Sequence, residues 1–143
     1  MWTKGLPESV IADRTARQLR AQGLDVRREV PYLSRSIDLV FLDEGLPVAV
    51  EFKYSHWRRA LAQAMYCLTG ATRAYICLPA GKVSEEVIVV AGQSGVGVLE
   101  LGTSGGSAPW REVLRAPKSK VMWGVGTEWL LGAFRTTPWV EDS

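Results

Sequence analysis

The chain has 143 residues and a formal net charge of +2, with 17 Lys and Arg against 15 Asp and Glu. That length favours one domain, and a hydrophobic content of 47% with a charged content of 22% is typical of a soluble globular protein. No apolar run approaches the roughly 18 residues of a membrane-spanning helix, so the sequence argues against a membrane protein.

The cysteines and the single histidine restrict the chemistry further. Cys67 and Cys77 fall in apolar runs without metal-ligand spacing, and one histidine, His56, rules out most multi-histidine metal sites. The first residues, MWTKGLPES, lack the apolar segment of a signal peptide. We therefore expect buried free thiols and a cytoplasmic location.

The first predicted element is a helix over residues 7–22. Pro7 suits the first turn of a helix, and Gly23 suits its end. Glu8 lies near the apolar side of this helix rather than opposite it. It either faces a functional site or interacts with the positive N-terminus of the helix. The apolar side consists of Ile11, Ala12, Ala16 and Leu19.

Three strands are expected next. Residues 24–33 should form a short or edge strand, because Pro31 cannot donate a ladder hydrogen bond. Within it, Glu29 either points toward a site or pairs with a neighbouring arginine. Residues 36–42 and 47–53 are rich in apolar and β-branched residues, and the Asp-Glu-Gly between them predicts a hairpin turn.

The turn fixes the register of this hairpin. A turn centred on Glu44 and Gly45 places Asp38 opposite Glu51, so that the two side chains share a face of the sheet. Lys53 joins Glu51 on that face, because side chains alternate along a strand. The other face would carry Val48, Val50 and Phe52.

Two opposed carboxylates repel each other and destabilise a sheet, unless a cation lies between them. Mg²⁺ prefers oxygen ligands from one or two carboxylates, together with waters and phosphate oxygens. Lys53 would then neutralise charge on a phosphate or orient an attacking water. The hairpin therefore predicts a metal site for phosphodiester chemistry; the alternative is a surface hairpin with ordinary charges.

At this point the chain resembles the PD-(D/E)xK, or restriction-endonuclease-like, nuclease superfamily. The matching residues are Asp38 in SIDLV and the tripeptide Glu51-Phe52-Lys53 in VAVEFK, while Ile37 replaces the proline of the family's name. The resemblance covers residues 5–101. It implies that Asp38, Glu51 and the backbone carbonyl of Phe52 bind Mg²⁺ or Mn²⁺, and that Lys53 assists catalysis.

The resemblance also gives roles to residues on two helices. Glu8 matches a glutamate that faces the active site from the first helix, as in Holliday-junction-resolvase-like members, and would be a further metal ligand. The second predicted helix spans residues 56–68, with Arg59, Gln63 and Tyr66 along one flank. Gln63 and Tyr66 resemble the QxxxY motif of RecB-like members, with one residue fewer between them. Its core side would be Trp57, Leu61, Ala64 and Leu68.

The remaining core elements are short. Residues 74–78 should form a buried strand, parallel to its neighbour through the helix crossover. A helix is expected from Ser84, with a strand over residues 87–90 as the alternative. Residues 95–101 would form the last core strand. The predicted fold is α/β, an αβββαβ restriction-endonuclease-like core with a mixed central sheet flanked by helices.

Residues 1–101 would form this core, and residues 102–143 a Trp-rich C-terminal extension. The extension starts with a Gly/Ser linker, and a short helix is possible over residues 128–134. Its aromatic rings either pack on the core, or stay exposed to stack on bases or form a dimer. In the second case Lys118 and Lys120 would contact phosphates. The tryptophans are Trp110, Trp123, Trp129 and Trp139.

Basic side chains near the candidate site favour a polyanionic partner. No acid occurs between Tyr54 and Ser84. We predict a metal-dependent nuclease, a repair- or resolvase-like endonuclease acting on DNA more than RNA, and the resemblance implies a homodimer. The alternative is a non-catalytic nucleic-acid-binding or assembly module on the same scaffold. The candidate nucleic-acid contacts are Arg35, Arg58, Arg59 and Tyr66.

Overall fold

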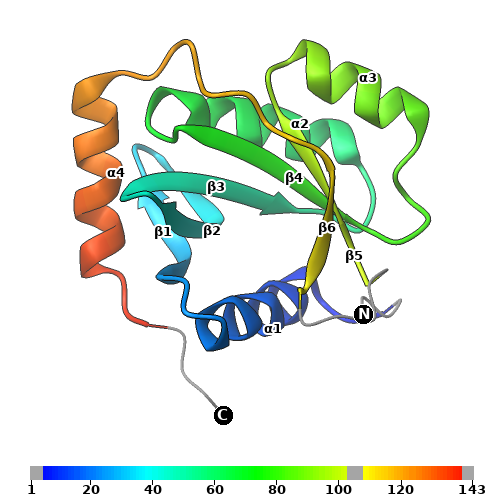
Figure 1. Cartoon of the computed structure of the whole chain (residues 1–143), viewed down its shortest axis with the longest axis horizontal. Helices are drawn as coiled ribbons and strands as arrows, with labels where there is room; N and C mark the ends of the chain where they lie inside the picture. The colour runs from blue at the N-terminus through cyan, green and yellow to red at the C-terminus, as the bar shows by residue number, and fades with distance from the viewer. Residues whose placement is uncertain (1–4, 103–107, 140–143) are drawn as a thin grey trace.

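The computed structural model describes residues 5–102 and 108–139. Within these residues, six strands form one mixed sheet and four α-helices pack against it (Figure 1). The strands are β1 (Val26–Tyr32), β2 (Arg35–Asp43), β3 (Leu46–Phe52), β4 (Arg73–Pro79), β5 (Gly97–Leu101) and β6 (Trp110–Leu114). The helices are α1 (Glu8–Ala21), α2 (Trp57–Tyr66), α3 (Glu85–Gln93) and α4 (Gly124–Thr136), and a 3₁₀ helix, η1 (Cys67–Thr69), follows α2.

The strands lie side by side in the order of the sequence, from β1 to β6. The β1–β2 and β2–β3 pairs are antiparallel, the β3–β4 and β4–β5 pairs are parallel, and β6 returns antiparallel to β5. β1 is an edge strand, as Pro31 predicted. The predicted order of helix, three strands, helix, strand, helix and strand is confirmed from α1 to β5.

Helices cover both faces of the sheet. α1 packs on one face, where its side chains Ile11, Ala16 and Leu19 share a buried cluster with Val50 and Phe52 of β3. The other face is covered by α2, α3 and α4. Its cluster includes Ala60, Leu61, Val87, Ala91, Leu130 and Phe134, together with Ala49 and Ile76 of the sheet. Central strands β3 and β4 are therefore buried on both sides.

The hairpin of β2 and β3 has the predicted register. Leu39 pairs with Val50, and the ladder continues to Asp43 and Leu46 at the turn. Glu44 and Gly45 have φ values of 53° and 78°, the left-handed backbone that a two-residue hairpin turn requires. Continuing the same register by one residue places Asp38 opposite Glu51.

The crossover elements also follow the prediction, with shifted ends. β4 is parallel to β3. The Ser84 side chain accepts a hydrogen bond from the Val87 N–H at 3.2 Å, so residues 85–93 are helical and the strand alternative is wrong. β5 begins at Gly97, where a Cβ would lie 2.6 Å from the Ala116 nitrogen. Only glycine fits here, because the backbone of Ala116, which follows β6, lies directly against it.

The C-terminal segment contributes more to the sheet than the sequence predicted. Residues 110–114 form β6 beside β5, so β5 is not the last strand. Trp110 packs against Phe41, with ring centroids 6.1 Å apart. α4 is longer than the helix predicted over residues 128–134. Most of the Gly/Ser linker, residues 103–107, lies outside the described residues. No described helix is long and apolar enough to cross a bilayer.

Candidate active site

The regular alternation of β1 and β2 is interrupted where Glu29 faces Asp38. The ladder pairs Arg28 with Leu39 and Val30 with Ile37, and skips the two acids between them. Glu29 has a φ of 51°, a left-handed backbone that costs a non-glycine residue about 1 kcal/mol or more. Strain of this kind persists where the surrounding structure imposes it, and it often marks a functional site.

The interruption changes which face each strand presents. Ile37 and Leu39 are two residues apart and would share a face in a regular strand. They instead pack in clusters on opposite faces of the sheet. Asp38 lies between them, at the point where the β2–β3 ladder also stops. Its Oδ2 accepts a hydrogen bond from the Phe52 N–H at 2.8 Å. The Asp38 carboxylate is thereby fixed to the end of β3, beside Glu51.

Glu51 is buried, with 4% of its surface exposed. Burial, followed by the charge of Asp38 and a hydrogen bond with its side chain, raises the pKa of Glu51 to about 9, and the positive charge of Arg35 opposes this rise. In the metal-free protein, Glu51 therefore keeps its proton at neutral pH. A buried carboxyl group that holds its proton beside a half-buried carboxyl group is suited to exchange that proton for a cation.

The donor set is small. Among the described residues, no group of three or more His, Cys, Asp or Glu side chains is arranged to hold a metal ion. Asp38, Glu51 and the carbonyl of Phe52, which follows Glu51 at the end of β3, remain as candidate ligands. Such a set fits Mg²⁺ or Mn²⁺ better than a metal that needs an all-protein cage, because Mg²⁺ keeps several waters and binds substrate phosphates.

Glu8 faces the site but pairs with the lysine. Its Oε1 lies 3.6 Å from Lys53 Nζ, and its Oε2 accepts a hydrogen bond from the Tyr54 N–H at 2.7 Å. The first turn of α1 is thus tied to the chain that leaves β3. In this arrangement Glu8 positions Lys53 and is not grouped with Asp38 and Glu51 as a third carboxylate.

A pocket of about 220 Å³ brings Asp38 together with Glu8 and Lys53, and Glu51 and Phe52 are not part of its lining. It is polar, and its lining comes from α1, from the strained part of β1 and β2, from the end of β3 and from α2. Gln63 lies in this lining together with Asp38 and Lys53. A molecule bound in the pocket would therefore be within reach of its amide. The lining residues are Glu8, Ser9, Ala12, Arg28, Glu29, Asp38, Lys53 and Gln63.

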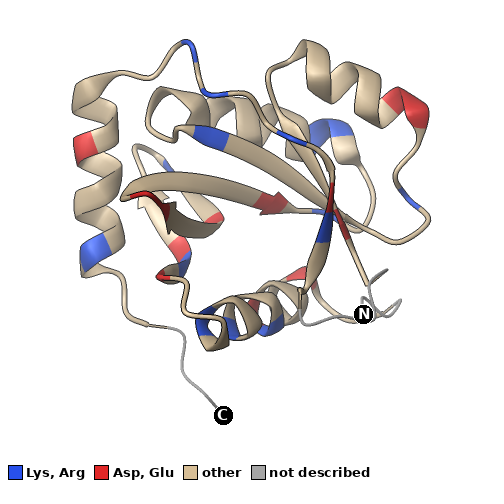
Figure 2. Cartoon of the chain, in the orientation of Figure 1, with Lys and Arg blue, Asp and Glu red and all other residues tan. Residues whose placement is uncertain are grey.

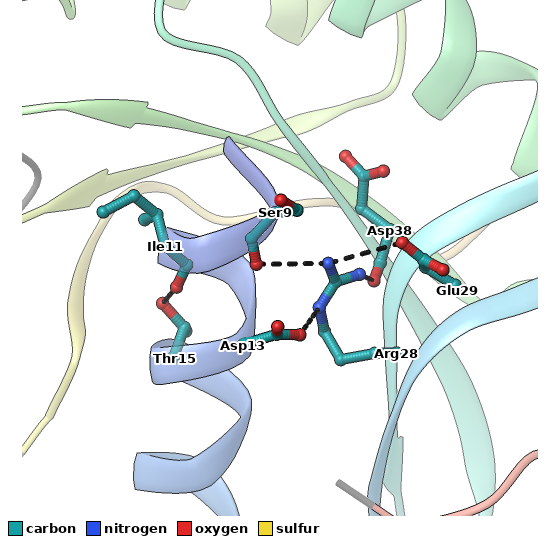
Figure 3. Close-up of polar contacts among 7 residues, drawn as sticks. All are labelled: Ser9, Ile11, Asp13, Thr15, Arg28, Glu29 and Asp38. Carbon is teal, nitrogen blue, oxygen red and sulfur yellow. Dashed lines mark hydrogen bonds and ion pairs between the residues drawn. The ribbon is translucent and has the colours of Figure 1, made fainter. Parts of the chain in front are cut away.

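Arg28 is a residue of this pocket that the sequence did not single out. Its side chain is only 10% exposed, and its Nε donates to Asp13 Oδ1 at 2.9 Å. Nη1 donates to the backbone carbonyl of Asp38, and Nη2 donates to the Ser9 carbonyl at 3.4 Å. Figure 3 shows the Asp38 carboxylate pointing away from the guanidinium. Arg28 therefore holds the backbone of Asp38 to α1 and leaves its carboxylate available.

The sequence left two placements open for Glu29, facing a site or pairing with a neighbouring arginine, and the structure shows both. It lines the pocket, and its Oε1 lies 3.8 Å from Arg28 Nη2 (Figure 3). Its side chain is mostly exposed, so this ion pair is weak. No pattern in the sequence indicates that Arg28 turns inward, because the left-handed backbone at Glu29 breaks the alternation on which such a prediction depends.

The four candidate nucleic-acid contacts fall into two groups. Arg35 lies over the Tyr66 ring, 5.4 Å from its centroid. Arg58 and Arg59 instead line a separate pocket at the start of α2, and Arg58 lies 3.5 Å from Glu86. Figure 2 shows basic and acidic residues interspersed around the sheet, with several basic positions along α1.

Comparison with known proteins supports the fold and goes no further. No protein-family model matches the sequence, and no curated protein matches it. The structure is similar to that of AF1548, solved as a protein of unknown function, with a TM-score of 0.54 and 19% sequence identity. The match covers 66% of this chain and 58% of AF1548. At this identity the similarity concerns the α/β fold alone.

Proposed function

We propose that the protein is a metal-dependent nuclease that hydrolyses phosphodiester bonds in DNA. The observation that carries the proposal is the pair of Asp38 and Glu51, two carboxyl groups held together at the end of β3 with the pKa of Glu51 raised to about 9. Such a pair is unfavourable by itself and becomes favourable when a divalent cation binds. The order α1-β1-β2-β3-α2-β4 is the αβββαβ order of restriction-endonuclease-like nucleases.

Each candidate site residue has a defined part in this proposal. Asp38, Glu51 and the Phe52 carbonyl would hold Mg²⁺ or Mn²⁺, which would acidify a water and stabilise charge on the phosphate. Lys53 presents its ammonium group to the same phosphate or orients the attacking water. Glu8 keeps Lys53 in place through the 3.6 Å ion pair. Gln63 offers an amide to the substrate or to Lys53.

The experiment is cleavage of labelled DNA duplexes and single strands by the full chain, with Mg²⁺, Mn²⁺ or EDTA. We expect Glu51→Gln and Lys53→Ala to reduce the rate by about a hundred-fold or more, because each removes charge stabilisation from the transition state. Glu85→Gln, an exposed acid at the start of α3, is the matched control and should cleave normally. Equal rates in all variants would refute the assignment.

A second candidate is a non-catalytic nucleic-acid-binding or assembly module. It is favoured by the engagement of Glu8 with Lys53, which leaves two carboxylates rather than three at the metal position. Calorimetric titration with Mn²⁺ separates the two functions. Absence of Mn²⁺ binding, together with DNA affinity that falls steeply with salt, would favour the second candidate. The preference for DNA, a homodimer and a cytoplasmic location are further parts of the proposal that rest on the resemblance.

A further inference from the structure

A cluster of aromatic rings lies beside the candidate active site, centred on Tyr32. The Tyr32 ring is fully buried. It makes edge-to-face contacts with Tyr66 of α2 and Trp129 of α4, with ring centroids 6.2 Å and 5.8 Å away. Its hydroxyl lies 2.6 Å from Thr69 Oγ1. Elements that are distant in the sequence therefore bring their rings to one place.

Tryptophans at this place remain exposed although their backbone is fixed. Trp123 and Trp129 are 54% and 42% exposed. The Trp123 N–H donates to the Thr69 carbonyl at 2.8 Å, and Thr127 Oγ1 donates to the Gly70 carbonyl at 3.0 Å. The start of α4 is thus fixed against η1. We call Tyr66, Trp123 and Trp129 the aromatic surface.

The aromatic surface lies near the candidate site, since the charge of Arg35 acts on Glu51. Tyr66 lies one turn of α2 after Gln63, which lines the pocket with Asp38 and Lys53. Arg35 lies over the Tyr66 ring and begins the strand that carries Asp38. A chain of nucleotides bound in the pocket would therefore reach these rings past Gln63 and Arg35.

Charge near the rings distinguishes among possible partners. Arg35 borders the aromatic surface on the side of the pocket, and the exposed Lys118 and Lys120 precede Trp123. Glu128 is the one acid on α4. Positive charge beside exposed aromatic rings favours a polyanion with accessible base faces over a second copy of this chain. The faces of paired bases inside a duplex are covered by their neighbours, so successive nucleotides can stack on these rings only where they are unpaired.

We propose that the aromatic surface binds unpaired nucleotides by stacking, so that the substrate of the adjacent site carries a single-stranded segment. This inference names the substrate class of the proposed nuclease and in that sense rests on the proposed function. The rings of Tyr66, Trp123 and Trp129 would stack on bases, and Arg35 would contact the phosphates that lead to the pocket. Stacking of this kind tolerates any base sequence, because every base has an aromatic face.

The test is binding to fluorescein-labelled DNA in EDTA, where no cleavage occurs, measured by fluorescence anisotropy. The probes are a dT oligonucleotide, a blunt duplex and the same duplex with a dT tail. We expect Trp129→Ala and Trp123→Ser each to weaken binding of the dT oligonucleotide and the tailed duplex by about five-fold or more, and to leave the blunt duplex unchanged.

Trp139→Ala is the matched control. Trp139 is 43% exposed, like Trp129, but it contacts Arg20 and Arg27 instead of Tyr32. The control should bind all three probes like the unaltered chain. Trp123→Ser is the second variant because Trp123 is the most exposed of the three rings that carry the proposal. Its substitution should therefore leave the fold intact. Thermal unfolding of each variant verifies that the fold is intact.

Three results would overturn the inference. They are unchanged dT binding in both variants, an equal loss for all probes, and a change from dimer to monomer by analytical ultracentrifugation with dT affinity unchanged. The last result would identify a dimer interface. Cleavage with Mn²⁺ keeps the two proposals separate. If nothing is cleaved but Trp129→Ala loses dT affinity, the nuclease proposal fails and the stacking proposal stands. If DNA is cleaved but dT binding is unchanged in the variants, the stacking proposal fails and the nuclease proposal stands.

Discussion

Glu51 shows most directly how a single residue connects stability with function in this protein. Its carboxyl group is buried against that of Asp38, in a position where an apolar or amide side chain would fold more easily. Deprotonation without a cation would leave two like charges in a site with little water. The local arrangement thus opposes the charged form that a metal would need, and metal binding must release a proton.

This conflict predicts a pH dependence of stability in EDTA. The pKa of Glu51 is raised from 4.5 to about 9, so between these values the folded chain binds more protons than the unfolded chain. The favourable contribution of protonated Glu51 is complete below pH 4.5 and is lost as the pH rises toward about 9. Unfolding free energy should therefore fall by at most about 1.4 kcal/mol per pH unit across that window.

Glu51→Gln should remove this slope, because glutamine does not titrate, and should make the chain more stable than the unaltered one at alkaline pH. Urea unfolding at several pH values, followed by circular dichroism, measures the effect. Glu85→Gln should retain the slope. Parallel curves for the unaltered chain and Glu51→Gln would show that Glu51 does not hold its proton.

At the scale of elements, α4 is held by a close contact at its start. A Cβ on Gly126 would lie 2.7 Å from the Thr69 carbonyl oxygen and from the Tyr32 hydroxyl oxygen. A Cβ on Gly132, in the same helix, would meet nothing within 4 Å. The two glycines are therefore opposite cases in one element. Gly126 allows close packing, whereas Gly132 only lowers the helix propensity.

Substitution of the two glycines should have opposite effects. Gly126→Ala forces the η1 segment or Tyr32 to move, and we expect it to destabilise the fold by about 1–3 kcal/mol. Gly132→Ala should stabilise it by about 0.5–1 kcal/mol, because alanine is the better helix former. Urea unfolding of both variants is the measurement. A stabilised Gly126→Ala variant would contradict the packing described for α4.

The elements also show why parts of the molecule were predictable. The hairpin follows from local chemistry, because Glu44 and Gly45 set the turn and thereby the register that brings Asp38 to Glu51. The pairing of β6 with β5 does not follow from local chemistry, because the Gly/Ser segment separates the two strands and tertiary contacts decide the pairing. Arg28 was missed for a related reason, since the left-handed backbone at Glu29 is imposed by tertiary structure and removes the alternation that assigns side chains to faces.

At the scale of the whole molecule, the candidate site joins parts from both faces of the sheet. Glu8 comes from α1 on one face and Gln63 from α2 on the other, while Asp38, Glu51 and Lys53 come from the hairpin between them. An ion held at this junction would link the helices to the sheet. Its binding energy would then add to the stability of the entire fold, because the unfolded chain has no such site.

Mn²⁺ should therefore raise the melting temperature of the full chain. At a concentration of about 100 times the dissociation constant, the stabilisation is about 2.7 kcal/mol, which corresponds to roughly 5–10 °C for a domain of this size. The shift should increase with pH, since Mn²⁺ competes with the proton on Glu51. Asp38→Asn and Glu51→Gln should abolish it, whereas Glu85→Gln should keep it. An equal shift in all variants would mean that Mn²⁺ binds elsewhere on the surface, and Asp38 and Glu51 would then be a carboxyl pair that holds no metal.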